Sequence, residues 1–130
     1  MPHHERGAAV AEFVLVMTLL VPLVLGIAQV ALVMHVRTTA TAAASEGARA
    51  AAPIDAAPSA AVERTRQIIV DSLDDRYASD ISAGYTIVDG IETTQVVVRG
   101  EVPALGLFGP SVGFEATGHA VRALEPEVGG

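Results

Sequence analysis

The most prominent pattern in the chain is a long apolar stretch near its start. Residues 13–36 contain no Asp, Glu, Lys or Arg, and nearly every side chain there is aliphatic. Because a helix rises ~1.5 Å per residue, about 20 such residues cross a hydrocarbon core of ~30 Å. We predict a transmembrane helix over residues 8–36. A buried helix of a soluble protein is disfavoured, because the rest of the chain is too short to surround it.

Polar segments flank this predicted span. Residues 1–7 form a short leader, and residues 37–52 are rich in Ala, the strongest helix former. The helix is therefore expected to continue out of the membrane until Pro53, where a residue that cannot donate a hydrogen bond ends it. Residues 37–58 are interpreted as a helical extension followed by a linker.

The remainder, residues 59–130, has the pattern of a small outer domain. Apolar positions that include Ile69 and Tyr77 recur at helical spacing, which predicts an amphipathic helix over residues 59–77 with Ser59 as its N-cap.

Strand-forming composition follows at residues 85–88, 93–102 and 111–124, with an Asp89-Gly90 turn after the first strand. The predicted fold class is α+β. A long N-terminal transmembrane helix extends out of the membrane, and a small domain follows with one helix on a three-stranded antiparallel sheet.

An apolar loop of sequence PALGLFGP joins the last two predicted strands at residues 103–110. Prolines bound it on both sides, and it contains no charged residue. We expect this loop to pack on the domain. Contact with the membrane surface or with a partner is the alternative.

The formal net charge of −7 lies mostly after Pro53, where the sequence contains twelve acidic residues and five arginines. This balance is opposite to that of a nucleic-acid-binding protein. The chain has no Cys, and its four His residues show no ligand spacing, so we predict no metal and no cofactor. No nucleophile motif is present, and neither an enzyme nor a small-molecule substrate is predicted.

Small residues recur along one side of the helical extension. Ala40, Ala44 and Ala48 are four residues apart, and Gly47 lies beside them. Side chains of this size let another helix approach closely. The alternative is a solvated helix that is merely rich in alanine.

A proline interrupts the apolar stretch at Pro22. It removes one intrahelical hydrogen bond and crowds the carbonyl of Thr18, which predicts a kink near this position.

An acidic residue, Glu12, stands at the N-terminal end of the apolar segment, beside Phe13. One interpretation is that the carboxylate stabilises the first helical turn by ~0.3–1 kcal/mol through the helix dipole. In another, a cut after Gly7 gives Ala8 a new amino group, and such an amine on a neighbouring chain neutralises Glu12. That pair would set the axial register between helices.

Three stretches in order carry a specific resemblance. RGAAVAEF at residues 6–13, the apolar segment through Gly26-Ile27, and HVRTTATAAASEGARAAA at residues 35–52 together resemble the TadE-like family of tight-adherence (Tad) pilus pseudopilins. The valine-rich strand, apolar loop and final strand of the outer domain are similar in outline. One departure is Thr18, where many members have a proline, whereas the proline here lies four residues later.

The resemblance implies a minor, pilin-like subunit of an adhesion pilus apparatus. It implies cleavage by a prepilin peptidase between Gly7 and Ala8, and partners among membrane lipid, other pilin-like subunits and pilus assembly proteins. It also implies a single-pass protein of the cell membrane, with its N-terminus cytoplasmic and its C-terminal domain outside. Arginine counts on the two sides of the span do not decide this orientation.

A secreted small acidic binding domain is the alternative function. In that case residues 1–44 would be an ordinary export signal, with Ala42-Ala43-Ala44 as its small-residue cleavage site. The apolar stretch is longer than the 7–15 residues usual for the core of a signal peptide, which disfavours this alternative.

Overall fold

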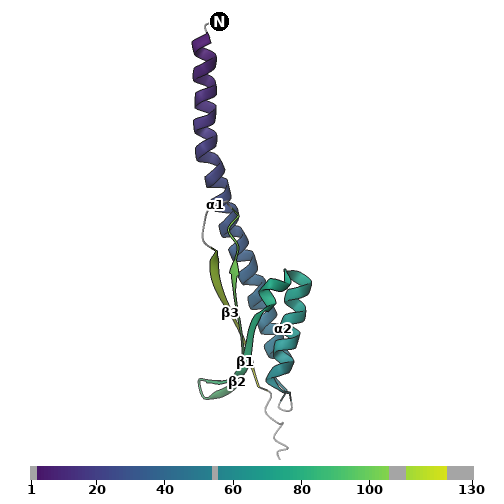
Figure 1. Cartoon of the computed structure of the whole chain (residues 1–130). Helices are drawn as coiled ribbons and strands as arrows, with labels where there is room; N and C mark the ends of the chain where they lie inside the picture. Colours follow the sequence, from purple (N-terminus) through teal and green to yellow (C-terminus); the bar gives the residue numbers. More distant parts are fainter. Residues whose placement is uncertain (1–2, 54–55, 106–110, 123–130) are drawn as a thin grey trace, which may run out of the picture.

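One long helix dominates the architecture, and a small sheet packs beside its second half. The protein is represented by a computed structural model that describes residues 3–53, 56–105 and 111–122. Its elements are α1 (His3–Ala50), α2 (Pro58–Ser72), the 3-10 helix η1 (Asp75–Ala78), β1 (Asp80–Val88), β2 (Ile91–Val102) and β3 (Val112–Val121). In Figure 1 the first half of α1 projects alone, and α2 and the strands gather along the remainder. The predicted α+β class is confirmed.

The sheet is a simple antiparallel meander in the order β1-β2-β3. Asp89 and Gly90 join the first two strands with φ angles of 52° and 79°. Two consecutive left-handed residues twist the chain in the sense that a two-residue hairpin needs, and Gly and Asp adopt this conformation at low cost. The turn predicted at these two residues is confirmed.

The second helix starts one residue earlier than predicted. Pro58 occupies its first turn, Ala57 is the N-cap, and no side chain caps the helix, so the role expected of Ser59 is wrong. Proline suits this position because its fixed φ is helical and the N–H that it lacks would have had no partner. The helix also ends at Ser72, and Tyr77 lies on η1.

The strand boundaries also differ from the predicted ones. β1 begins at Asp80, five residues before the expected start. All of β1 is paired with β2, from Val88 opposite Ile91 to Asp80 opposite Arg99. Pairing with a long neighbour thus extends β1 through Gly84, which has a weak strand propensity. The end predicted for the last strand, Leu124, lies outside the described residues.

The second half of α1 is part of the core of the domain. It covers the face of the sheet formed by β2 and β3, while α2 lies beside it over β1. No large aromatic side chain is fully buried in the described structure. The largest fully buried apolar side chains are those of Ile69, Val36, Val96, Val98 and Val102. Alanines fill the interface from the α1 side, namely Ala40, Ala43, Ala44, Ala48 and Ala51.

Two glycines allow α1 to approach its neighbours backbone to backbone. A Cβ atom at Gly118 of β3 would lie 2.7 Å from the carbonyl oxygen of Ala44 and closer still to the backbone nitrogen of Ser45. A Cβ atom at Gly47 would meet the Thr65 hydroxyl and would lie 2.7 Å from the carbonyl oxygen of Ala61 on α2. Neither backbone can move aside alone, so any larger residue must push the elements apart.

We therefore expect Gly118→Ala to lower the free energy of unfolding by about 2 kcal/mol, because the new methyl group overlaps backbone atoms of α1. Gly84→Ala on β1 is the matched control. No atom lies within 4 Å of a Cβ atom there, and its effect should stay within about 0.5 kcal/mol. Thermal unfolding of the detergent-solubilised chain, followed by circular dichroism, measures both, and equal stability of the two variants would contradict the close approach.

Candidate functional site

The first half of α1 presents an apolar surface that nothing in the described structure covers. Residues 5–27 are all exposed, and the apolar window of this helix has none of its residues buried. A patch of this size is far larger than the few hundred Å² that a soluble monomer exposes. The helix is long and apolar enough to cross a membrane. Its large exposed side chains include Val10, Phe13, Val14, Leu15, Val16, Leu19, Leu20, Val21, Leu23, Val24 and Ile27.

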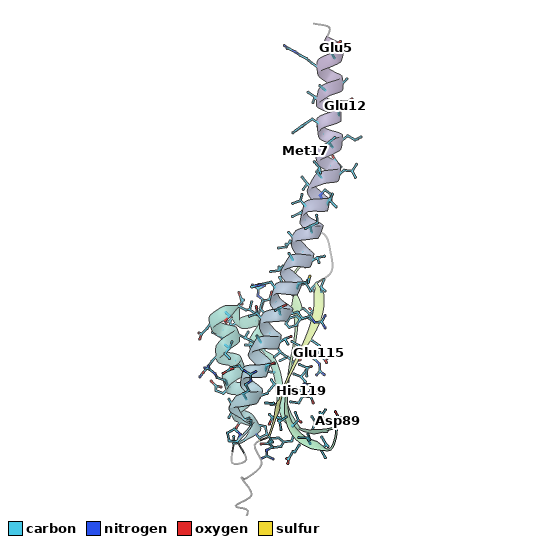
Figure 2. All side chains as sticks on the ribbon, turned by 180° about the vertical axis from the view of Figure 1, so that it is seen from behind. Glu5, Glu12, Met17, Asp89, Glu115 and His119 are labelled. Atoms are coloured by element: carbon cyan, nitrogen blue, oxygen red, sulfur yellow. The ribbon has the colours of Figure 1, made fainter. Side chains whose placement is uncertain are left out.

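The N-terminal residues singled out in the sequence lie on this projecting part. Gly7 and Ala8 are exposed within α1, and no atom lies within 4 Å of a Cβ atom built at Gly7. Figure 2 shows Glu5, Glu12 and Met17 spaced along the same part of the helix, with Asp89 at the opposite end of the molecule. The Gly7–Ala8 peptide bond is therefore remote from the folded domain.

Glu12 and Phe13 are neighbours in the sequence, but the helix directs them about 100° apart. Both are exposed, and Phe13 has 61% of its surface accessible. In the part of the chain that the structure describes, the Glu12 carboxylate has no hydrogen-bond or ion-pair partner. It is the last charged group before the aliphatic surface begins. A carboxylate at that place requires a partner from outside the chain if lipid surrounds the helix.

Pro22 lies inside α1, and the helix continues through it without a break. The hydroxyl of Thr18 donates to the carbonyl oxygen of Val14 at 2.7 Å. Pro22 leaves the backbone carbonyl of Thr18 without its usual donor. The hydroxyl of the same Thr18 is engaged one turn earlier, at Val14. The kink expected at Pro22 stays a prediction.

The small residues of the helical extension face the chain's own domain. Ala40, Ala44, Gly47 and Ala48 are buried, with β3 against Ala44 and α2 against Gly47. The helix that approaches this stripe is thus α2 of the same chain. The Thr65 hydroxyl adds a long hydrogen bond of 3.4 Å to the carbonyl oxygen of Ala43 at the same crossing.

A contact that the sequence did not indicate joins the apolar helix to the loop after β2. The Gln29 side chain donates from Nε2 to the carbonyl oxygen of Pro103 at 3.2 Å. Its Oε1 accepts from the backbone N–H of Leu105 at 2.8 Å. One amide therefore satisfies two backbone groups of an irregular segment. In the sequence, Gln29 stands out as a lone amide in an aliphatic stretch. Its hydrogen-bond partners lie more than seventy positions away, and no local pattern identifies them.

Some charges of the outer domain are paired with one another. The backbone N–H and the guanidinium of Arg76 both donate to Asp74, which lowers the pKa of that carboxyl to about 2. The carboxylate of Glu115 accepts from Arg99 at 2.9 Å and raises the pKa of the guanidinium. The lowered pKa keeps Asp74 ionised at neutral pH and the raised pKa keeps Arg99 protonated, so neither of these two groups suits general acid–base chemistry at that pH.

The arrangement of the described elements defines a class of protein. An exposed apolar helix leads directly into a small α+β domain, and this combination indicates a single-pass membrane protein.

Comparison with known proteins supports the resemblance expected from the sequence. Residues 7–49 match the family described as TadE-like protein. The matched segment begins at the glycine predicted to precede the cleavage site and ends one residue before the end of α1. The matched family is one of structural proteins associated with the Tad pilus. No curated protein and no solved structure matches the chain.

The Gln29 contact predicts a specific loss of protection in the loop. With Gln29→Leu, the amide hydrogen of Leu105 should exchange about fivefold faster, because one hydrogen bond is worth ~1 kcal/mol net. Gln95→Leu on β2 is the control, since it makes the same change away from the loop. Hydrogen–deuterium exchange of the full chain in detergent measures both, and an unchanged Leu105 amide in the Gln29 variant would exclude the contact.

Proposed function

We propose that the chain is a minor pilin-like subunit of a Tad pilus apparatus and acts structurally through the packing of its first helix. One observation carries the proposal. The family-matched segment coincides with α1, whose first half is bare and apolar while its second half is built into the domain. A helix of this kind places one half among lipids or sister helices and holds the outer domain on the other half.

In this proposal the N-terminus is cytoplasmic and a prepilin peptidase removes residues 1–7. Glycine within a helix costs about 1 kcal/mol relative to alanine, so Gly7 weakens the first turns of α1. The scissile bond therefore opens easily into the extended form that a peptidase needs. Its exposure and its distance from the domain support access by a membrane enzyme.

Glu12 sets the axial register between subunits. After the cut, Ala8 carries a positive amino group one helical turn before Glu12. An unpaired carboxylate well inside the bilayer costs several kcal/mol, whereas a pair with the amine of a neighbouring chain avoids that cost. The pair forms only at one relative height of two helices, so it would align the subunits along their axes.

The alternative of a secreted domain disagrees with the packing. A cut before Ser45 would remove Val36, Ala40, Ala43 and Ala44, each at most 1% exposed in the folded chain. The sheet would lose much of its cover, and the close contact of Gly118 with α1 would disappear. A domain with so few large buried side chains is poorly able to lose this part of its core.

The position of the cut tests the proposal directly. N-terminal sequencing of the protein from the membrane fraction should give a start at Ala8, and Gly7→Val should leave the chain intact from Met1. Gly26→Val is the control, because that glycine is equally open within α1 and its variant should still be processed. A mature start near Ser45 would instead support the secreted domain.

The register role predicts a separate effect of Glu12. With Glu12→Gln, cleavage should be largely retained while incorporation into the pilus apparatus falls strongly, because the ion pair is lost. Glu5→Gln changes the same group within the leader and should assemble normally. Co-purification of the variant with pilus components measures incorporation, and normal assembly of the Glu12 variant would remove the register role.

A further inference from the structure

The bare part of α1 has the length of a bilayer core. Counted from Ala8, the first half-buried residue is Ala28, so the bare part is Ala8 to Ile27, which is twenty residues or about 30 Å of helix. This length agrees with the ~30 Å hydrocarbon core. Beyond it, Leu32, Val33 and Val36 pack against the domain core, so they have protein neighbours where the sequence suggested lipid.

The loop after β2 reaches the helix at this same level. Gln29 lies one residue past Ala28, and its amide holds the carbonyl of Pro103 and the N–H of Leu105. An irregular backbone is tolerated near lipid only when its polar groups are satisfied. Gln29 satisfies two of them. The apolar side chain of Leu105 nevertheless remains 46% exposed.

We propose that residues 103–105 form an interfacial contact with the bilayer, with Leu105 entering the boundary between head groups and acyl chains, and that Gln29 fixes the depth of the membrane span by holding this loop. The inference rests on the membrane insertion proposed above. Lipid is the occupant because the loop adjoins the end of the helix segment that lipid would cover.

The charge of the domain agrees with a contact limited to this loop. Residues 103–105 carry no charge, whereas the sequence after Pro53 is strongly acidic. Acidic side chains are repelled from anionic head groups, so an uncharged segment next to the helix can approach the bilayer more closely than the acidic surface can. The loop therefore acts as a stop that holds the acidic domain just above the membrane.

Because the chain contains no Trp, single tryptophans can report depth. We would place Leu105→Trp, Leu19→Trp or Ile87→Trp in the full chain, in phosphatidylcholine vesicles with nitroxide groups either near the head group or near the chain end. Leu19 lies in the middle of the bare helix, and Ile87 lies on β1 beside the hairpin turn with 73% of its surface exposed.

The expected result is quenching of the Leu105→Trp variant by the shallow nitroxide together with a blue-shifted emission. The Leu19→Trp variant should be quenched by the deep nitroxide, and the Ile87→Trp variant only by iodide in the water. Adding Gln29→Leu to Leu105→Trp should reduce the shallow quenching, while adding Gln95→Leu should not.

The reporters separate the two proposals. If the Leu19 reporter is quenched by lipid but the Leu105 reporter responds only to iodide, the interfacial contact is wrong and the membrane span stands. If neither responds to lipid, the proposed membrane insertion fails as well. If Gln29→Leu leaves shallow quenching intact, the role of Gln29 in setting depth is overturned. A nitroxide attached at Leu105→Cys, the sole thiol in such a chain, gives an independent measure of depth should the tryptophan variant fold poorly.

Discussion

The close contact between α1 and the sheet is the interaction on which the rest of the structure depends. Gly118 of β3 lies against the backbone of Ala44 and Ser45, and Gly47 lies against the Thr65 hydroxyl and the α2 backbone. With so few large side chains in the core, burial comes mainly from bringing whole elements near one another. The domain therefore cannot be separated from the helix that carries it.

A continuous helix has a mechanical consequence. α1 runs from His3 to Ala50 without a break, so its bare half and its packed half form one element. Any shift of the span along its axis moves the outer domain by the same amount. The two places at which the helix height could be set, Glu12 near one end of the span and Gln29 near the other, are therefore linked through the same element.

The outer domain is stabilised by ion pairs between its own segments. Its ion pairs tie neighbouring segments together, as Arg99 does with Glu115 across β2 and β3. A second pair joins Arg122 to Glu92, and the guanidinium of Arg122 lies 4.0 Å above the ring of Tyr85. The contacts of Arg122 secure the strands near the hairpin end of the sheet, which is the end farthest from the bare helix (Figure 2). Arg99 and Glu115 pair nearer the other end of the sheet, where Arg99 lies opposite Asp80.

The amino-acid sequence alone determined the features that depend on neighbouring residues. The apolar run from 13 to 36 indicated a membrane helix, and the Asp89-Gly90 pair indicated a hairpin, because both follow from local geometry. Only the tertiary structure decided that Ala40, Ala44 and Ala48 face the sheet, since an alanine stripe is equally compatible with solvent or with another helix. The capture of residues 103–105 by Gln29 also depends on groups far apart in the chain, and only folding brings those groups within hydrogen-bonding distance.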